Sequence, residues 1–327
     1  MYDNLIDLLG AYDINCRRLE ILDIPQGADN LNILFACESG RFVFRCYKVT
    51  PDDEIPFELE VIERLHRMGF PTAAVIRTKG GRLLTDTMKG AGALFHFVDG
   101  RPIDPRTPGS LEKAVALLTE LHRLMRGMQV ETHRRRSRTD ASRIRRLESM
   151  LSGCEDTPQA RSLIGFAQLA RETSDAFENR AATATPALPF GIIHHDFNPG
   201  NILVNECGDV VALLDFDEAH EGHLLLDLAA LLHYWCYDLD AGLNLAAAAE
   251  AVAHYHRRRP LTPEERDCVR EAILLNLAAD ASDYLAGEVA RGHRNVQLDS
   301  CHSYQRFSRL RAIPNWERRL LEGLPGT

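Results

Sequence analysis

The sequence predicts an α+β protein, because strand-type and helix-type patterns occupy different parts of the chain. Between residues 19 and 98, short apolar runs alternate with turn residues, which is typical of antiparallel strands. After residue 110, apolar residues recur at helical spacing over longer segments. At 327 residues, the chain is long enough for two lobes with separate cores or for one large domain. We therefore expect a β-rich first part followed by a larger, mostly helical part.

The composition describes an ordinary globular protein and argues against several other classes. Apolar residues make up 45% and charged residues 26% of the chain, proportions that are typical of folded domains. No apolar run reaches the roughly 18 residues of a membrane-spanning helix, and the N-terminus lacks the basic and apolar segments of a signal peptide. The eight cysteines are scattered without a CxxC pair, which favours reduced thiols in the cytoplasm. The net charge of −9 argues against nucleic acid as a partner.

Two predicted elements of the first lobe carry complementary charges. A strand over residues 42–48 places Arg45 among apolar neighbours, whereas Lys48 has the opposite side-chain parity and is expected in solvent. A helix over residues 55–68 carries Glu58 on its apolar face. Because an unpaired buried carboxylate is costly, Glu58 requires a partner there, and Arg45 is the natural one. The alternative is that Glu58 lies at the edge of the apolar stripe, in water.

Turn and capping signals predict the remaining elements. Glu38-Ser39-Gly40 separates two strand-type runs and indicates a hairpin, and Gly69-Phe70-Pro71 ends the first long helix. Ser110 can begin a helix, and Thr262-Pro263-Glu264-Glu265 is a capping box that starts another. Further helices are expected over residues 142–180, 227–235, 245–257 and 303–321. The arginine-rich residues 134–146 are interpreted as a solvated surface, with contact to an anionic partner as the alternative.

A second hairpin is predicted in the middle of the chain, and polar residues flank it on both sides. Residues 202–204 and 210–214 are strand-type runs, and the turn residues 205–209 lie between them. Such a hairpin brings the residues before its first strand and after its second strand to the same end. These residues are His194, Asp196 and Asn201 before the hairpin and Asp215 and Asp217 after it.

Phosphoryl transfer is the chemistry that requires this arrangement. An amide and a carboxylate, here Asn201 and Asp215, can hold Mg²⁺ against a triphosphate. A separate carboxylate, Asp196, can accept the proton of an attacking hydroxyl. The spacing matches the kinase pattern of an Asp, an Asn five residues later, and a metal-binding Asp after the next strand. Asp217 is a candidate second ligand or an acceptor outside the metal's ligand shell. The alternative is an ordinary hairpin whose turn carboxylates are solvated. Three polar residues at this spacing, with apolar strands between them, argue against that alternative.

At these positions the sequence resembles the aminoglycoside phosphotransferase and choline kinase-like family. The resemblance is strongest over residues 190–232 and rests on His194-x-Asp196-x4-Asn201, Leu214-Asp215-Phe216-Asp217 and Asp227-Leu228-Ala229. Residues 254–285 also resemble the C-terminal part of bacterial homoserine kinases of the same superfamily. The resemblance implies a bilobal protein-kinase-like fold, with an N-lobe over residues 1–98 and a C-lobe over residues 99–327. It also implies that Mg-ATP phosphorylates the hydroxyl of a small molecule.

The resemblance implies a nucleotide site in the N-lobe. Arg45 would take the role of the phosphate-pairing lysine, and its pair with Glu58 would reproduce the kinase strand–helix ion pair. The loop at residues 26–32, which includes Asn30, would cover the phosphates with backbone N–H groups. An ordinary hairpin turn fits this loop equally well, because it contains one glycine. Phe97 lies in a run that resembles the hinge whose backbone meets adenine. The expected phosphate donor is ATP, which the sequence does not distinguish from GTP.

The same resemblance assigns supporting residues to the C-lobe. Asp227 enters an apolar helix and would accept hydrogen bonds from N–H groups of the catalytic loop. His194 would support that loop rather than act as an acid or base. His122 is interpreted as a packing or capping residue, and His195 as a residue that fills space.

Candidate contacts to the substrate come from the C-terminal helices. Asp280 and Asp283 lie one turn apart on one predicted helix face and could meet a cation. Asp238 and Asp240 are further candidates. Homoserine kinase relatives carry a positive residue in the terminal helices to meet an amino-acid carboxylate, and residues 276–280 contain none. This difference favours amino-sugars or amino-alcohols over homoserine, while all three remain open.

Two other functions are compatible with the same fold. One is a protein Ser/Thr kinase of the bacterial stress-response type, which needs an open cleft. The other is a nucleotide-binding scaffold without catalysis. The presence of Asp196, Asn201 and Asp215 argues against the scaffold. The sequence thus predicts a small-molecule kinase that binds ATP, Mg²⁺ and an amine-bearing hydroxyl compound.

Overall fold

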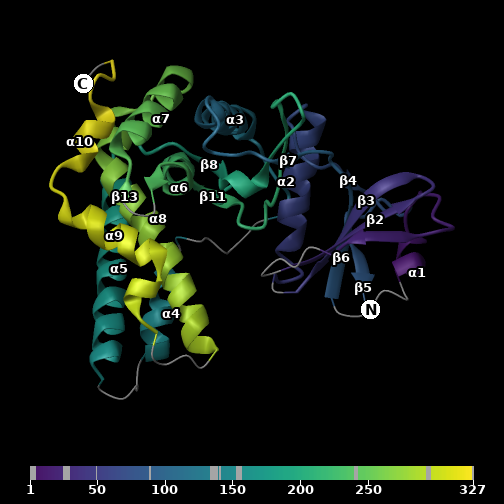
Figure 1. Ribbon diagram of the computed structural model, residues 1–327, viewed down its shortest axis with the longest axis horizontal. Helices are drawn as coiled ribbons and strands as arrows, with labels where there is room; N and C mark the ends of the chain where they lie inside the picture. The colour runs from purple at the N-terminus through teal and green to yellow at the C-terminus, as the bar shows by residue number, and fades with distance from the viewer. Residues whose placement is uncertain are drawn as a thin grey trace. The chain divides into compact units, whose positions relative to one another are not determined.

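A computed structural model shows a mixed helix and strand protein, as predicted, whose chain groups into two compact units (Figure 1). The structure describes residues 5–24, 30–48, 50–87, 90–132, 139, 141–151, 157–238, 242–291 and 296–325. Unit 1 consists of Met1–Ile103, Gly127–Arg135 and Gly200–Asp217. Unit 2 consists of Asp104–Arg126, Arg136–Pro199 and Glu218–Thr327. Residues 25–29 of the predicted phosphate loop, residues 133–138 of the arginine-rich run, and Asp240 lie outside the described residues.

Unit 1 contains an antiparallel sheet in the order β1-β2-β3-β6-β4, with β5 paired to β6. Its strands are β1 (Glu20–Asp23), β2 (Asn30–Cys37), β3 (Gly40–Tyr47), β4 (Val75–Ile76), β5 (Thr85–Thr87) and β6 (Gly90–His96). The predicted hairpin joins β2 and β3 in a register that pairs Cys37 with Gly40. Phenylalanines of these strands pack against the short helix α1 (Leu5–Leu9) to form the core of the sheet. Alternating side-chain burial along β2 and β3 is the expected consequence of strand geometry.

Helix α2 (Ile55–Arg67) has the predicted apolar face. Val61, Ile62 and Leu65 are buried, and Glu58 is completely buried on the same face. The helix ends before Gly69, which adopts a φ of 81° that favours glycine. Lys48, at the end of the neighbouring strand β3, is exposed as its parity predicted.

The second predicted hairpin is present and belongs to unit 1. It is formed by β9 (Ile202–Val204) and β10 (Val210–Leu213), and β7 (Arg101–Pro102) pairs with β9. The Leu213 N–H donates to the Pro71 carbonyl at 2.8 Å, and the Thr72 hydroxyl donates to the Leu213 carbonyl at 3.0 Å. These bonds group the hairpin with unit 1, although the expected division at residue 98 places it in the second lobe. Hydrogen bonds between distant segments, rather than sequence order, decide this grouping.

Gly100 permits the close approach of this hairpin. A Cβ atom on Gly100 would lie 2.9 Å from Val211 Cγ2 and 3.2 Å from the Val204 carbonyl oxygen. Any side chain at this position would therefore displace β9 and β10, which carry the polar residues of the predicted site.

Unit 2 is a helical assembly around α8 (Pro263–Ala290), which contacts α4, α5, α6, α9 and α10. The other helices are α3 (Ser110–Met125), α4 (Ala141–Leu151), α5 (Pro158–Thr183), α6 (Leu224–Trp235), α7 (Leu245–Arg258), α9 (His302–Ala312) and α10 (Trp316–Leu321). The strand pairs are β8 (Phe190–Ile193) with β11 (His220–His223) and β12 (Tyr237–Asp238) with β13 (Gly242–Leu243). Short 3₁₀ turns occur at Pro199–Asn201 and Leu298–Ser300. In Figure 1, α5 and α8 lie side by side.

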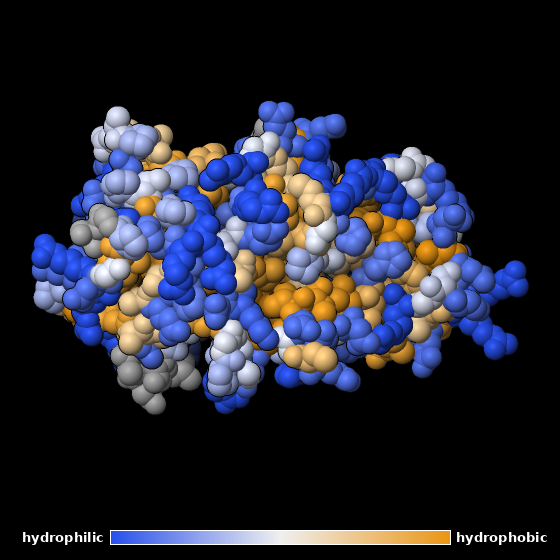
Figure 2. Space-filling model, turned by 90° about the horizontal axis from the view of Figure 1, so that it is seen from above, coloured by the Kyte–Doolittle hydropathy of each residue, from blue (hydrophilic) through white to orange (hydrophobic). Residues whose placement is uncertain are grey.

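The surface is predominantly hydrophilic on the face shown in Figure 2, where apolar patches interrupt charged and polar side chains. Large exposed hydrophobic residues among those described include Phe190, Met68 and Ile6. None of the helices in the described ranges combines the length and the apolar character needed to cross a bilayer.

The predicted capping box begins α8. The Thr262 hydroxyl accepts the Glu265 N–H at 3.2 Å, and the Glu265 carboxylate accepts the Thr262 N–H at 2.9 Å. Pro263 occupies the first turn, where a missing N–H costs nothing. Both signals therefore fix the start of the helix around which unit 2 is built.

We expect Thr262→Ala to lower the free energy of unfolding by about 1 kcal/mol, because the Glu265 N–H loses its acceptor. For a protein of this size, the melting temperature should fall by roughly 2–4 °C, measured by calorimetry or circular dichroism. Thr183→Ala, an exposed position in the last turn of α5, is the matched control. If both variants melt at the same temperature, the capping box has no measurable role.

Candidate active site

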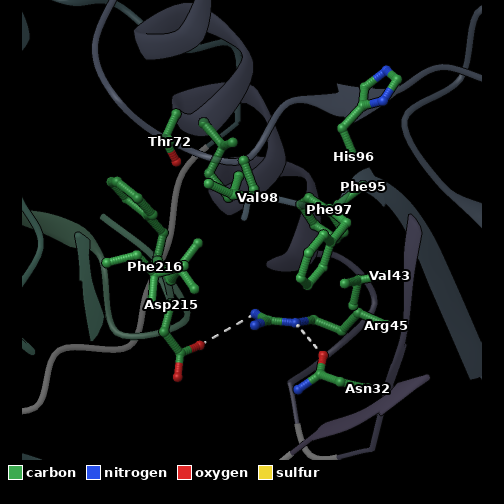
Figure 3. Close-up of a pocket in the computed structure, with 14 residues that line it drawn as sticks. Asn32, Val43, Arg45, Thr72, Phe95, His96, Phe97, Val98, Asp215 and Phe216 are labelled. Carbon is green, nitrogen blue, oxygen red and sulfur yellow. Dashed lines mark hydrogen bonds and ion pairs between the residues drawn. The ribbon is translucent and has the colours of Figure 1, made fainter. Parts of the chain in front are cut away.

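A cavity of about 270 Å³ lies within unit 1 between the sheet and the β9–β10 hairpin (Figure 3). Most of its lining is apolar and comes from Val43, Ile62, Phe95, Phe97, Val98, Leu203, Leu214 and Phe216. Its polar side chains include Asn32, Arg45 and Asp215. An apolar cavity with a few convergent polar groups is the usual form of a small-molecule site.

Arg45 makes the predicted ion pair with Glu58 and a second one with Asp215. Its Nη1 lies 3.0 Å from Glu58 Oε1 and 3.2 Å from Asp215 Oδ1. Its Nε donates to Asn32 Oδ1 at 3.0 Å, and the Tyr47 hydroxyl donates to Glu58 Oε1 at 3.1 Å. Figure 3 shows the guanidinium between Asp215 and Asn32. The alternative of a solvent-exposed Glu58 is therefore wrong.

The charges around Arg45 keep it protonated in spite of its burial. Burial by itself disfavours the charged form, but the carboxylates of Asp215 and Glu58 outweigh it and raise the pKa of Arg45 above its usual value. The same environment, chiefly burial, raises the pKa of the Tyr47 hydroxyl well above its usual value. The cavity thus contains a permanent cation that is fixed by three side chains from different elements.

Asn201 and Asp215 are neighbours at the open end of the β9–β10 hairpin, as predicted. The Leu214 N–H donates to the Asn201 carbonyl at 2.8 Å, so that the two residues lie on adjacent chain segments. Asp215 adopts a φ of 64°, a left-handed conformation that is uncommon for residues other than glycine and recurs at functional sites. One amide and one carboxylate are hard oxygen donors that fit Mg²⁺, which usually takes one or two protein ligands and completes its shell with phosphates and water.

Asn30 belongs to the described part of the predicted phosphate loop. Its side chain lies beside Asp217. It is buried at the start of β2, and its Nδ2 lies 3.5 Å from Asp217 Oδ2. Asn30 therefore orients a carboxylate next to the metal-binding candidates.

Phe97 lines the cavity, but its backbone N–H is already used. It donates to the Arg41 carbonyl at 3.2 Å, and the Arg41 guanidinium lies 4.5 Å from the centre of the Phe97 ring. The expected hinge contact with adenine cannot use this N–H, which leaves the Phe97 ring and carbonyl and the backbone of Val98.

Asn32 is a cavity residue that the sequence did not single out. The β2–β3 register places Asn32 opposite Arg45, so the predicted hairpin turn could have identified it.

Asp227 anchors the loop that carries Asp196 through the backbone hydrogen bonds that the resemblance implied. Its carboxylate accepts the His194 N–H at 3.0 Å and the His195 N–H at 2.6 Å. The Asp196 N–H donates to His194 Nδ1 at 3.2 Å, so His194 supports the loop. The Asn198 side chain, which sequence reasoning missed, donates to Asp196 Oδ2 at 3.0 Å. Asp196 is thereby oriented from both its backbone and its carboxylate.

His122 is a partner of Asp227 and not only a packing residue. Its Nε2 lies 3.0 Å from Asp227 Oδ2, and its Nδ1 lies 2.8 Å from the Tyr255 hydroxyl. Since a carboxylate can only accept, Nε2 carries a proton and donates it to the hydrogen bond with Asp227. Burial opposes ionisation of Asp227, but the hydrogen bond and charge of His122 prevail and lower the pKa of Asp227 to about 2.

His195 has a defined position and does more than fill space. It is completely buried and adopts a φ of 61°. Its Nε2 lies 3.1 Å from Nδ2 of Asn276, a buried residue of α8. The residue before Asp196 is therefore tied to the helical core as well as to Asp227.

The predicted site residues are divided between the two units. Unit 1 holds Asn30, Arg45, Glu58, Phe97, Asn201, Asp215 and Asp217, and unit 2 holds Asp196, His194, Asp227, Asp280 and Asp283. Asp280 and Asp283 are both half-buried on α8, and Asp280 accepts a hydrogen bond from the Ser303 hydroxyl. The boundary between the units passes between Pro199 and Gly200, so the loop that carries Asp196 continues directly into the segment that carries Asn201.

Comparison with known proteins decides the family. The model of a phosphotransferase enzyme family matches residues 20–261. The chain belongs to this family. It is 30% identical over 291 residues to a homoserine kinase of Nitrobacter winogradskyi, covering 86% of this chain and 85% of that protein. It is also 30% identical over 284 residues to a homoserine kinase of Pseudomonas aeruginosa, with 84% and 85% covered.

Solved structures show the same fold. An amicoumacin kinase in complex with AMP-PNP, Ca²⁺ and Ami superposes with a TM-score of 0.68 at 15% identity, covering 96% of this chain and 92% of that one. A choline kinase from Cryptosporidium parvum has a TM-score of 0.64 at 14% identity, covering 98% and 96%. The predicted protein-kinase-like fold is confirmed. This phosphotransferase is a small-molecule kinase that acts on a hydroxyl group.

We expect the stabilising effect of Asp227 to depend on pH. Its pKa is about 2 in the folded protein against 3.8 ordinarily, so the stabilisation is complete above about pH 5 and is lost as pH falls through 3.8 towards 2. The free energy of unfolding of the wild type exceeds that of Asp227→Asn at pH 6. This difference should be smaller by about 2 kcal/mol at pH 2.5. Chemical denaturation at both pH values measures this difference.

Asp209→Asn, an exposed position in the turn between β9 and β10, provides the baseline for loss of one surface carboxylate. A difference in the free energy of unfolding between wild type and Asp227→Asn that stays constant with pH would contradict the role of Asp227 as a buried anion.

Proposed function

We propose that this kinase transfers the γ-phosphate of Mg-ATP to the hydroxyl of a small amine-bearing acceptor, with a homoserine-like amino acid as the first candidate. The buried cation Arg45, held between Glu58 and Asp215 at the polar side of the cavity, is the observation that carries the nucleotide part. A cation fixed in this way is suited to the phosphates of a nucleotide. Asp196, oriented by Asn198 and His194, supports the transfer part.

Each residue of the cavity has a distinct role in this proposal. The apolar walls, which include Phe97 and Val98, take the adenine base. Arg45 pairs with the phosphates. Asn201 and Asp215 would hold Mg²⁺, which would supply charge neutralisation at the phosphates. Asp217, whose Oδ2 lies 3.5 Å from Asn30 Nδ2, would be a second ligand or an acceptor beside the metal.

The reaction requires one proton acceptor and an in-line geometry. The acceptor oxygen forms a bond to the γ-phosphorus while the bond between this phosphorus and the β–γ bridging oxygen breaks, and ADP leaves. The proton of the hydroxyl passes to the Asp196 carboxylate. Asn198 donates to Asp196 Oδ2, which orients the carboxylate for this role.

The relatives support an amino acid as the acceptor. Homoserine kinases match this chain over more than four-fifths of its length at 30% identity. The sequence favoured amino-sugars or amino-alcohols because residues 276–280 of α8 contain no cation. Helix α9, whose Ser303 hydroxyl donates to Asp280, carries a cation, Arg306, one turn further along. This weakens the objection to an amino-acid acceptor.

We expect Asp196→Asn to lower kcat by about 10²–10⁴-fold with little change in the KM for Mg-ATP, because the proton acceptor is lost. The measurement is ADP release with homoserine, choline, ethanolamine, aminoglycosides and a generic protein as acceptors. Asp209→Asn makes the same chemical change at an exposed turn and should retain wild-type rates. No ADP release above the Asp196→Asn level with any acceptor would refute the proposed function.

We expect Asp215→Asn to raise the Mg²⁺ concentration for half-maximal rate by at least about 10-fold, because an anionic oxygen ligand becomes neutral. Titration of Mg²⁺ at saturating ATP measures the shift, again with Asp209→Asn as the control. An unchanged Mg²⁺ dependence would remove Asp215 from the proposed metal site.

A further inference from the structure

His195, the residue directly before Asp196, has a backbone conformation that its side chain makes costly. Its φ of 61° lies in the left-handed region, where the Cβ atom of any residue other than glycine is crowded by the following carbonyl oxygen. Its N–H donates to Asp227 Oδ1 at 2.6 Å, and this bond requires only the backbone. A glycine could make the same bond without strain. A strained conformation persists where the surrounding structure enforces it, so the contacts of the imidazole ring decide what this residue does.

Helix α8 holds the His195 ring from one side. The His195 Nε2 atom lies 3.1 Å from the Nδ2 atom of Asn276, which is itself buried in the middle of α8. Since an amide nitrogen can only donate, Nε2 is the acceptor of this hydrogen bond. The His195 residue has no exposed surface, so its ring does not meet a substrate directly. These observations argue against an acid–base role and in favour of a fixed position for the ring.

Strand β11 holds the His195 ring through a second histidine, His220. The centres of the two rings lie 5.1 Å apart, and their planes are inclined by 53°. His220 is buried, and its Nδ1 lies 2.8 Å from the Glu218 carbonyl oxygen. Because a carbonyl oxygen can only accept, Nδ1 of His220 carries a proton and donates to Glu218. The His220 ring is therefore fixed by its own chain segment, and it presents a rigid surface to His195.

The pairing of β8 with β11 provides the space for the His220 ring. The register places His220 opposite Ile193, two residues before His195. A Cβ atom on Gly222 would lie 2.7 Å from Ile193 Cδ1 and 3.2 Å from His220 Nε2. Any side chain at position 222 would therefore displace Ile193 or the His220 ring. The glycine leaves the volume in which the two histidine rings meet.

We propose that His195 is a positioning residue for phosphoryl transfer, whose ring, bonded to Asn276 and packed against His220, keeps the peptide before Asp196 in its strained conformation. The assignment rests on the proposed function, in which the Asp196 carboxylate accepts the proton of the hydroxyl. Asp227 holds only the backbone of His195. Without the ring, this backbone can relax toward a commoner φ, which turns the Asp196 side chain away from its direction in the wild type. A misplacement of about 1 Å is enough to lower a rate roughly 100-fold.

The first test compares two substitutions that both remove the ring but differ in strain. His195→Ala keeps a Cβ atom in the left-handed conformation, whereas His195→Gly fits it. In both variants, kcat for ADP release should fall by about 10–100-fold, measured with the acceptor that the wild type phosphorylates fastest. The KM for Mg-ATP should stay within about threefold of the wild-type value. The melting temperature of His195→Gly should nevertheless exceed that of His195→Ala by roughly 2–4 °C.

A merely structural role of the ring gives a different result. In that case both variants would keep the wild-type kcat at temperatures well below their melting temperatures, because every folded molecule would have an intact site. Rates are therefore measured below the melting temperature of every variant. His302→Ala, at an exposed position of α9, is the matched control. A kcat of His195→Gly within about threefold of the wild type overturns the proposal.

The second test leaves the ring in place and removes its hydrogen-bond donor. Asn276→Ala should lower kcat by about 10-fold with little change in the KM for Mg-ATP. The double variant of His195→Gly with Asn276→Ala should be no slower than His195→Gly alone, because Asn276 acts through the ring. Asn179→Ala, at an exposed position of α5, is the matched control. Reductions in kcat that multiply in the double variant would show that Asn276 does not act through His195, and would overturn the proposal.

The variant Asp196→Asn, assayed beside the others, separates this inference from the proposed function. It gives the rate that remains without the proton acceptor. A His195→Gly rate equal to that of the wild type and well above that of Asp196→Asn overturns the positioning role and leaves the kinase function intact. A wild type no faster than Asp196→Asn with any acceptor refutes the proposed function, and the positioning role with it.

Discussion

The buried carboxylate of Asp227 is the constraint on which the loop that carries Asp196 depends. It has no exposed surface, and a buried anion is tolerated only when hydrogen bonds replace its hydration. The N–H groups of His194 and His195 and the ring of His122 provide these bonds. The loop before Asp196 is thereby attached to α6 and α3 at one side chain. The position of the proposed base follows from a requirement of burial, not from the chemistry that it performs.

A buried cation organises the cavity of unit 1 in the same manner. Arg45 is bound by Glu58 from α2, by Asn32 from β2 and by Asp215 after the β9–β10 hairpin. Three segments that are distant in sequence meet at one guanidinium. The hairpin that carries Asn201 and Asp215 is therefore fixed relative to the sheet, and a cation and a proposed metal ligand share one wall of the cavity.

Local patterns predicted a large part of this site. The parity of β3 separated Arg45 from Lys48, the helical spacing placed Glu58 on the buried face of α2, and the turn residues of the second hairpin brought Asn201 and Asp215 together. Such predictions succeed because strand alternation, helical period and turn chemistry are set by neighbouring residues. Asn32, Asn198, His122 and Asn276 were missed or undervalued. Polar residues of this kind are common, and only the partner shows whether one of them is buried and bonded.

The sequence by itself determined the class of chemistry, the order of the helices and strands, and the residues proposed to carry out phosphoryl transfer, since these depend on short spacings along residues 194–217. The tertiary structure alone decided the long-range partners. His122 reaches Asp227 across 105 residues, and the hairpin after Asn201 groups with the first hundred residues. The physical reason is that a buried charge requires a partner of opposite sign or a hydrogen-bond donor. Many residues of the chain satisfy that requirement chemically, and the packing of the helices selects one of them.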